Sequence, residues 1–153
     1  MQDIEIRSAT EKDRKIWAET RAKLWPDLYV VEHMKEIDKL MATDYECWLA
    51  MKGDECVGFV EASVRPFANG CESMPVAFVE GIWVDKNYRR NQLGGKLIKE
   101  VERWAARKGL SELGSDALLA NTDSQKTHEQ WGFEESERVV YYRKSIDPSE
   151  DTE

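Results

Sequence analysis

The sequence predicts one domain in which helices pack on a mixed β-sheet. Its 153 residues suit a single core, because domains of roughly 100 to 200 residues are the usual size. Along the chain, segments with the period of two that strands show are interleaved with segments of helical period. No internal repeat or low-complexity segment interrupts this succession, so we expect a layered α/β fold.

The first elements are expected to be a short strand and two helices. Residues 4–6 alternate between apolar and polar, as strands do. Thr10 is followed three positions later by Asp13, the pattern of a capped helix start, and Pro26 should end that helix. Residues 30–41 have their apolar side chains on one side and predict a second helix.

The middle of the chain is expected to form the centre of the sheet. Over residues 45–65, two apolar runs flank Gly53-Asp54, which is typical of an antiparallel hairpin. After a loop that contains Asn69-Gly70, residues 76–84 are so apolar that we expect a central strand buried on both faces.

The second half should contain two helices and two short strands. Residues 93–107 carry an apolar stripe at helical spacing, and Gly109 follows as a C-cap. A short strand at 112–117, a helix at 122–131, the turn Gly132-Phe133 and a last strand at 139–143 are then expected. We place the domain at residues 1–146 and an acidic flexible tail at 147–153.

Charge and cysteine content narrow the class of protein. The net charge of −8 argues against a nucleic-acid surface and favours a cationic partner, although many soluble cytosolic proteins are acidic too. The three cysteines are widely spaced and lack a neighbouring His cluster, so we expect no metal site, no disulfide and a reducing compartment. The sequence contains neither a signal peptide nor an apolar run long enough to cross a membrane, and a cytoplasmic location is therefore expected.

A turn that suits phosphate binding follows the apolar strand. Residues 85–97 read Asp-Lys-Asn-Tyr-Arg-Arg-Asn-Gln-Leu-Gly-Gly-Lys-Leu and lead into the helix at 93–107. A basic, Gly-containing turn at a helix start presents free N–H groups and the positive helix end to an anion. An ordinary turn with solvated basic residues would share this pattern, so it does not by itself establish a phosphate site.

The same turn resembles the coenzyme A loop of the GCN5-related N-acetyltransferases. That loop has Arg or Gln, two residues, Gly, one residue, then Gly or Ala; Arg89 and Gly94 match, whereas Gln92 replaces the middle Gly. Gln at a positive φ would cost about 1 kcal/mol or more, and at a negative φ it would be tolerated. The order of elements from residue 4 to 145 is also similar to that family. The resemblance implies a mixed, mostly antiparallel sheet with a splayed central strand, and acetyl-coenzyme A as cosubstrate.

The resemblance also implies which residues contact the coenzyme. The backbone of the strand end, the loop and the start of the later helix are expected to do so, namely Ile82, Trp83, Val84, Arg89, Arg90, Asn91, Gln92, Leu93, Gly94, Gly95 and Asn121. As a helix N-cap, Asn121 would be explained without the coenzyme as well.

A narrower resemblance is to the chromosomal-type aminoglycoside 6'-N-acetyltransferases. The motifs that carry it are Leu24-Trp25-Pro26, Glu61-Ala62-Ser63-Val64-Arg65, Phe78-Val79-Glu80-Gly81-Ile82, Ser115-Asp116 and Gly132-Phe133-Glu134-Glu135-Ser136-Glu137. This resemblance implies a homodimer that acetylates an amino group of an aminoglycoside, a small molecule with several ammonium groups.

Acidic and aromatic residues are the candidates for the acceptor site. Glu80 interrupts an apolar strand and Asp116 ends a short one, so both are candidates for binding ammonium groups and for accepting the proton of the attacking amine. The resemblance adds Trp25, Phe67 and Glu137 as substrate contacts. The alternative for Glu80 is an acid at a strand bulge whose hydrogen bonds come from the backbone, and for Asp116 it is a turn cap. The alternative for Trp25 is a core position, and for Glu137 a solvated surface position.

The mechanism implied is direct transfer, with backbone N–H groups of residues 82–84 polarising the thioester carbonyl. His128 lacks a triad partner in the sequence, and no cysteine has a basic neighbour, so we expect no covalent acetyl-enzyme. Acetylation of another amine, or coenzyme binding without catalysis, remain the alternative functions.

Overall fold

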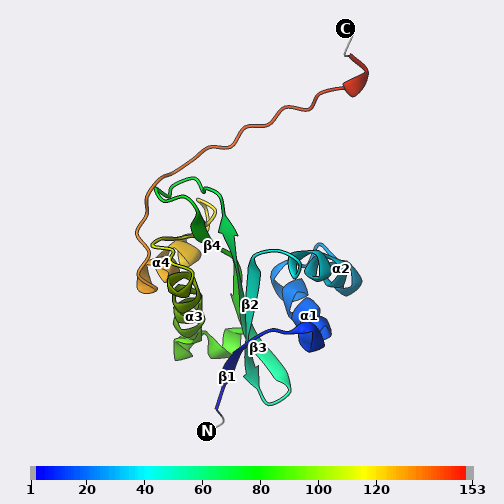
Figure 1. The fold of residues 1–153 in the computed structure, drawn as a ribbon, viewed down its shortest axis with the longest axis vertical. Helices are drawn as coiled ribbons and strands as arrows, with labels where there is room; N and C mark the ends of the chain where they lie inside the picture. The colour runs from blue at the N-terminus through cyan, green and yellow to red at the C-terminus, as the bar shows by residue number, and fades with distance from the viewer. Residues whose placement is uncertain (1–2, 151–153) are drawn as a thin grey trace.

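A five-stranded sheet forms the centre of the protein (Figure 1). The computed structural model describes residues 3–150, apart from the side chains of Arg90, Asn91 and Glu150. Strands β1 to β4 pair antiparallel in chain order, and β5 pairs parallel to β4. The strands are β1 (Glu5–Ser8), β2 (Tyr45–Lys52), β3 (Glu55–Arg65), β4 (Val76–Val84) and β5 (Leu113–Gly114). The predicted mixed, mostly antiparallel sheet is confirmed.

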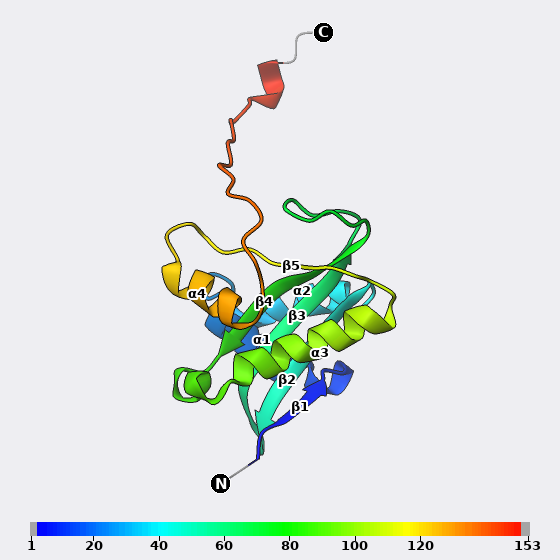
Figure 2. The ribbon, with the colours of Figure 1, turned by 90° about the vertical axis from the view of Figure 1, so that its left-hand side faces the viewer.

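Helices cover both faces of the sheet (Figures 1 and 2). One face carries α1 (Arg14–Leu24) and α2 (Val30–Leu40), and the other carries α3 (Leu93–Arg107) and α4 (Thr122–Gln130). The described part of the chain also contains three short 3-10 helices, namely η1 (Glu11–Asp13), η2 (Lys86–Asn91) and η3 (Pro148–Glu150). None of the helices within residues 3–150 combines the length and the apolar character needed to span a membrane.

The alternation of side chains along the strands creates two hydrophobic cores. In β2, Cys47, Leu49 and Met51 pack with α1 and α2, whereas Trp48 and Ala50 pack with α3. Because both faces of β2 and β3 are covered, these strands are buried over most of their length. The sheet thus provides a rigid base from which the loops at its edges extend.

Local sequence signals define the ends of the elements as expected. Thr10 starts the η1–α1 segment with a capping box, in which its N–H donates to Asp13 at 2.8 Å. The turn after β2 lies at Gly53-Asp54, and α3 has the predicted bounds. The backbone N–H of Phe133 donates to the carbonyl of His128 and closes the turn after α4.

Three predictions about strands are wrong in part or whole. β4 is buried over Val76–Val79 only, because β5 pairs with it at Ala77 and Phe78 and no further. The strand expected at 112–117 contains two paired residues. Residues 139–143 form no strand, since no strand within residues 3–150 lies beside them to share backbone hydrogen bonds. Instead, the chain after α4 passes the β3–β4 loop, where Ser136 lies against Gly70, and then extends away from the body of the protein (Figures 1 and 2).

Candidate functional site

The end of β4 leaves part of its backbone unpaired. Beyond Phe78, β4 continues to pair with β3 on one side but has lost β5 on the other. A bulge opposite Glu61 and Ala62 falls at Glu80 and increases the bend of the strand. Because alternate residues face β3, the N–H groups of Ile82 and Val84 point to the open side and, within the described residues, are available to a ligand, whereas Trp83 faces β3. This is the splay expected from the sequence.

The loop after β4 leads directly to the N-terminus of α3. The guanidinium of Arg89 folds back and donates to the carbonyl of Val84 at 2.9 Å. The first intrahelical bond of α3 runs from the Lys96 N–H to the Gln92 carbonyl, so the N–H groups of Leu93, Gly94 and Gly95 have no partner within the helix. No acidic residue lies in the first turn to neutralise the positive helix end. This donor set fits a pyrophosphate. The side chains of Arg90 and Asn91 lie outside the described part of the chain.

Gln92 has the left-handed backbone conformation, with φ of 59° and ψ of 21°. It is the non-glycine residue with positive φ in the described chain. Of the two alternatives considered for this position, the strained one applies: the loop keeps the shape that a glycine would take and accepts the strain of a side chain.

Replacing Gln92 with Gly should raise the free energy of unfolding by about 0.5–1 kcal/mol. The relief of left-handed strain, about 1–2 kcal/mol, exceeds the roughly 0.5–1 kcal/mol of extra backbone entropy that Gly brings to the unfolded chain. Urea unfolding followed by circular dichroism measures the difference. Gln92→Ala is the matched control, because Ala keeps the strain and should show no gain.

Gly94 is required by a neighbouring tryptophan as well as by the loop. A Cβ atom on Gly94 would lie 2.7 Å from Cζ2 of Trp131, which follows α4. Gly95 is less constrained, since its Cβ would meet the same ring at 3.6 Å. The start of α3 and the end of α4 therefore depend on each other for their packing.

Glu80 is the centre of a polar cluster on the exposed end of the sheet. Its carboxylate accepts hydrogen bonds from Ser63 Oγ at 2.6 Å and from both Arg65 Nε and Nη2 at 2.8 Å. Burial would raise the pKa of Glu80, but the bonds from Arg65 and Ser63 outweigh it, and the pKa lies below its usual value. Glu80 is thus held as a carboxylate. The hydrogen bonds from Arg65 and Ser63 explain how this acid is accommodated in an apolar strand.

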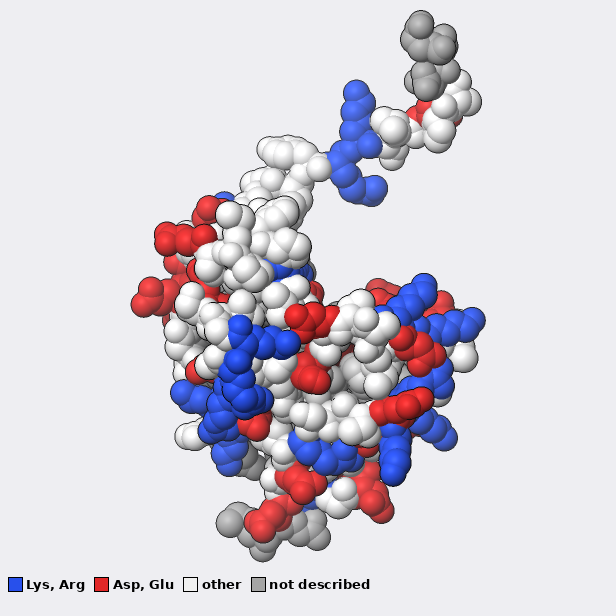
Figure 3. Space-filling model, in the orientation of Figure 1, with Lys and Arg blue, Asp and Glu red and all other residues white. Residues whose placement is uncertain are grey.

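Asp116 lies close to this cluster but is not tied to it. The residue is exposed just after β5, and its charge helps to raise the pKa of Arg65, after the larger effect of Glu80. Within the described residues its carboxylate accepts no hydrogen bond. Figure 3 shows acidic side chains in the hollow between the side of the molecule with α1 and α2 and the side with α4. The two carboxylates differ in environment, because Glu80 is paired with Arg65 whereas Asp116 acts on Arg65 only through its charge.

Trp25 contacts the same strand from the opposite helical layer. It caps the C-terminus of α1, and its ring lies against Gly81, the residue after Glu80. Trp25 packs against the core and is partly exposed, and its role as a substrate contact remains a prediction. The geometry brings together Trp25, Glu80 and the β4 end.

Phe67 and Glu137 are not joined to the cluster by any contact in the described chain. Phe67 is 65% exposed in the loop after β3. Glu137 is exposed next to Ser136, whose Oγ would lie 2.7 Å from a Cβ on Gly70 of that same loop. Both lie on the β3–β4 loop side, and their roles as substrate contacts remain predictions.

Asn121 is the N-cap of α4, as its alternative interpretation proposed. Its Oδ1 accepts the backbone N–H of Ser124 at 3.1 Å. The cap uses the oxygen and leaves the amide NH₂ group able to donate to another molecule. A coenzyme contact through this group therefore remains compatible with the cap.

His128 connects β5 and α4. Its Nδ1 lies 2.7 Å from the Ser124 carbonyl and its Nε2 lies 2.8 Å from Ser115 Oγ. Because a carbonyl can only accept, Nδ1 carries the proton and Nε2 accepts from the Ser115 hydroxyl. The ring also packs on Trp131 and Phe133, with centroids 5.3 and 5.2 Å apart. The contacts explain His128 as a structural link.

A buried cluster around Glu61 was not found from the sequence. Glu61 is fully buried in β3 and accepts hydrogen bonds from Trp17 Nε1 at 2.7 Å and from the Tyr45 hydroxyl. Arg21 Nε lies 3.1 Å from its carboxylate. Burial raises the pKa of Glu61, and the charge of Arg21 and the hydrogen bonds from Trp17 and Tyr45 oppose that effect. The signal was present in the sequence: like Glu80, Glu61 interrupts an apolar strand.

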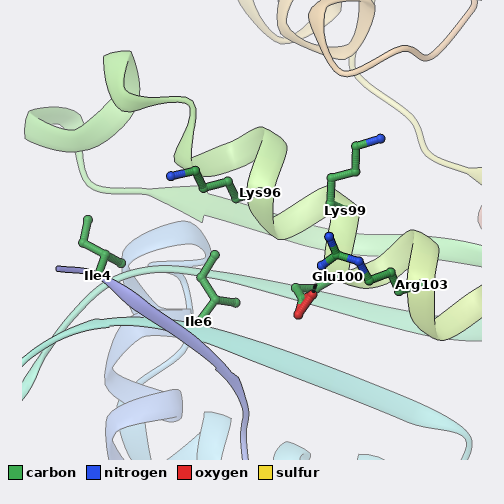
Figure 4. Close-up of a pocket in the computed structure, with 6 residues that line it drawn as sticks. All are labelled: Ile4, Ile6, Lys96, Lys99, Glu100 and Arg103. Atoms are coloured by element: carbon green, nitrogen blue, oxygen red, sulfur yellow. Dashed lines mark hydrogen bonds and ion pairs between the residues drawn. The ribbon is translucent and has the colours of Figure 1, made fainter.

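A shallow pocket lies away from these residues, between the sheet edge and α3 (Figure 4). It has a volume of about 360 Å³ and is lined by Ile4, Ile6, Lys96, Lys99, Glu100 and Arg103. Arg103 is paired with Glu100 at 2.6 Å, which partly neutralises the basic lining. None of the acceptor-site candidates contributes to this pocket, so we assign no role to it.

Comparison with known proteins is consistent with this geometry. The model of the acetyltransferase (GNAT) family matches residues 11–133. An aminoglycoside N(6')-acetyltransferase type 1 of Salmonella enteritidis is 38% identical over 143 residues, which are 92% of this chain and 99% of that protein. The structure is similar to that of AAC(6')-Iy in complex with the bisubstrate analogue CoA-S-monomethyl-acetylneamine, with a TM-score of 0.88, 37% identity, and coverage of 94% of this chain and 99% of that one. A complex of AAC(6')-Iy with CoA has a TM-score of 0.90 at 36% identity and covers 95% and 97% of the two chains.

Proposed function

Since the chain belongs to the acetyltransferase (GNAT) family, we propose that it transfers an acetyl group from acetyl-coenzyme A to the 6'-amino group of an aminoglycoside and so confers resistance to it. The observation that carries the acceptor class is the Glu80 carboxylate, held ionised by Arg65 and Ser63 where β4 parts from β5. A fixed negative charge at this point suits an acceptor with several ammonium groups. The relatives named above act on such acceptors.

Acetyl-coenzyme A supplies the acetyl thioester. The free N–H groups of Leu93, Gly94 and Gly95 would hold its pyrophosphate, with Arg89 nearby, and the amide of Asn121 would donate to the pantetheine arm. The N–H groups of Ile82 and Val84, on the open side of β4, would donate to the thioester oxygen. Apart from Arg89, which donates to the Val84 carbonyl, these groups make no hydrogen bond as donors among the described residues.

The acceptor amine must lose a proton before it can attack. Because its pKa is lowered, Glu80 is a weak proton acceptor and suits the binding of an ammonium group. Asp116 lies close by without a hydrogen-bond partner in the described residues, and we assign it the proton, passed through water. The amine nitrogen then forms the amide bond as the carbon–sulfur bond breaks and the thiolate leaves. Trp25, Phe67 and Glu137 would contact the sugar rings.

An acceptor panel tests this function. The protein is incubated with acetyl-coenzyme A and kanamycin, tobramycin or spermidine, thiol release is followed, and the acetylated position is located by mass spectrometry. Turnover of the two aminoglycosides at the 6'-amino group, and a raised inhibitory concentration in cells that express the protein, are expected. Faster turnover of spermidine would reassign the acceptor, and tight coenzyme binding without turnover of any amine would indicate a non-catalytic module.

We also propose that the protein is a cytoplasmic homodimer. All three cysteines are free, as a reducing compartment requires. The segment 134–147 carries large apolar side chains that are 48–91% exposed, namely Val139, Val140, Tyr141 and Tyr142. Such a surface is unusual on an isolated chain and suits a second copy whose sheet edge is equally open.

Charged residues in this segment should weaken the dimer. Substitution of both Val140 and Tyr142 with Glu places two charges among the exposed apolar groups, and we expect a shift from dimer to monomer of at least tenfold in dissociation constant. Light scattering after gel filtration over a range of concentrations measures this. Arg143→Ala, in the same segment, is the control and should leave the dimer unchanged. A wild-type protein that is monomeric at all concentrations contradicts the proposal.

A further inference from the structure

The Trp25 ring takes the space that a side chain at position 81 would need. A Cβ atom on Gly81 would lie 2.4 Å from Cη2 and 2.5 Å from Cζ2 of Trp25, far inside van der Waals contact. Gly81 is not among the residues with positive φ, so its lack of a side chain serves this contact and not a backbone turn. The ring thus lies directly on the strand, one residue from Glu80.

Three further contacts hold the ring in this position. The guanidinium carbon of Arg21 stacks 4.8 Å from the ring centroid, and Phe59 packs edge-on with its centroid at 6.3 Å. The backbone carbonyl of Trp25 lies 2.9 Å from Nε2 of His33, which is fully buried in α2. Trp25 is therefore fastened by its ring and by its backbone.

Arg21 is in turn held by the buried acid of β3. Its Nε lies 3.1 Å from Glu61 Oε2, within ion-pair distance, although the N–H does not point at the oxygen closely enough to form a hydrogen bond. Arg21 is only 5% exposed, and its Nη1 has no partner in the described residues. An arginine placed for the stability of the core would normally satisfy these donors. Its position is explained by two contacts together, the ion pair with Glu61 and the Trp25 ring on which it stacks.

We propose that Glu61, Arg21 and Trp25, which we call the Trp25 clamp, are a positioning device for the acceptor. The clamp fixes the height of the indole above Gly81 and so sets the gap between an aromatic face and the Glu80 carboxylate. A ring of this kind binds the apolar face of a sugar, and the carboxylate binds its ammonium group. Glu61 and Arg21 touch neither reacting atom and act through Trp25. The acceptor-binding role rests on the proposed function, whereas the packing does not.

Gly81→Ala tests the clamp. The added methyl must displace Trp25, so the dissociation constant of tobramycin, measured by calorimetry with coenzyme A present, should rise about tenfold or more, and the acceptor KM should rise more than kcat falls. The dissociation constant of coenzyme A should stay within about twofold. In Gly81→Ala/Trp25→Ala the methyl meets no ring, so this double variant should bind tobramycin no more weakly than Trp25→Ala alone.

A second variant tests the part of Arg21 and Glu61. Arg21→Met/Glu61→Gln removes the buried charges together and avoids leaving one of them unpaired. It should weaken tobramycin binding about fivefold while coenzyme binding is kept. The control Arg14→Ala/Asp38→Ala removes the exposed ion pair between α1 and α2, 2.7 Å long, and should leave both affinities unchanged.

The outcomes separate the clamp from the proposed function. Wild-type protein that binds tobramycin without acetylating it refutes the function, and the affinities still test the clamp. Wild-type protein that does not bind tobramycin refutes the clamp as an acceptor device. A folded Gly81→Ala variant with unchanged affinity, or full additivity of Gly81→Ala and Trp25→Ala, also overturns it.

Discussion

Replacing Glu61 with Ala should lower the free energy of unfolding by about 3–5 kcal/mol, the usual cost of removing one partner from a buried ion pair. The Arg21 guanidinium would remain 5% exposed with no opposite charge beside it. The indole N–H of Trp17 and the hydroxyl of Tyr45 would lose their acceptor at the same time. Urea unfolding measures the change.

The matched control is Glu55→Ala. Glu55 is the exposed first residue of the same strand, and its loss should change stability by no more than about 0.5 kcal/mol. Arg21→Met/Glu61→Ala should be more stable than Glu61→Ala, because it leaves no unpaired charge. A loss below about 1 kcal/mol for Glu61→Ala would mean that water reaches Arg21 and that the cluster is not a closed structural unit.

Replacing Glu80 with Gln should lower kcat/KM for an aminoglycoside about 100-fold. The amide keeps the shape of the side chain but loses the charge that pairs with an ammonium group, a change of about 1.5–3 kcal/mol for a charged hydrogen bond. The bonds from Arg65 at 2.8 Å would weaken as well, and the guanidinium would then repel the acceptor. Steady-state kinetics measure the loss, and Glu55→Gln is the control.

The pH dependence distinguishes this role from proton transfer. Because the folded pKa of Glu80 is lowered, the stability that its ion pair contributes is present above the unfolded pKa of about 4.3 and is lost as the pH falls through the lower folded value. Glu80 is therefore ionised throughout the neutral range. The Glu80→Gln variant should keep the position of the neutral limb in the profile of kcat/KM against pH. A limb that disappears in this variant would assign the proton to Glu80.

Elements with local signals were predicted well from the sequence. The apolar stripe and Gly109, which follows the C-cap Lys108 with a positive φ, sufficed for α3, and Thr10 with Asp13 sufficed for the start of the first helix. These signals involve residues within a few positions of one another. The hairpin turn at Gly53 belongs to the same class.

Features that depend on residues far apart in the sequence were missed or predicted only in part. The alternation over 139–143 has the period of a strand, but a strand also needs a neighbour, and the described chain provides none. Glu80 was singled out without Arg65, which lies 15 residues away and reaches it only because β3 and β4 pair. Glu61 was overlooked for the same reason, since Arg21 and Trp17 come from α1.

The contact of Trp131 with Gly94 has a consequence for the variation that this loop tolerates. A methyl group at position 94 would lie 2.7 Å from the indole, so position 94 cannot become larger while Trp131 is kept. In a library randomised at both positions, pairs with a larger residue at 94 and a smaller one at 131 should survive selection for drug tolerance more often than the frequencies from single-position libraries predict. Such compensation would show that the coenzyme loop and the terminal turn of α4 can change only together.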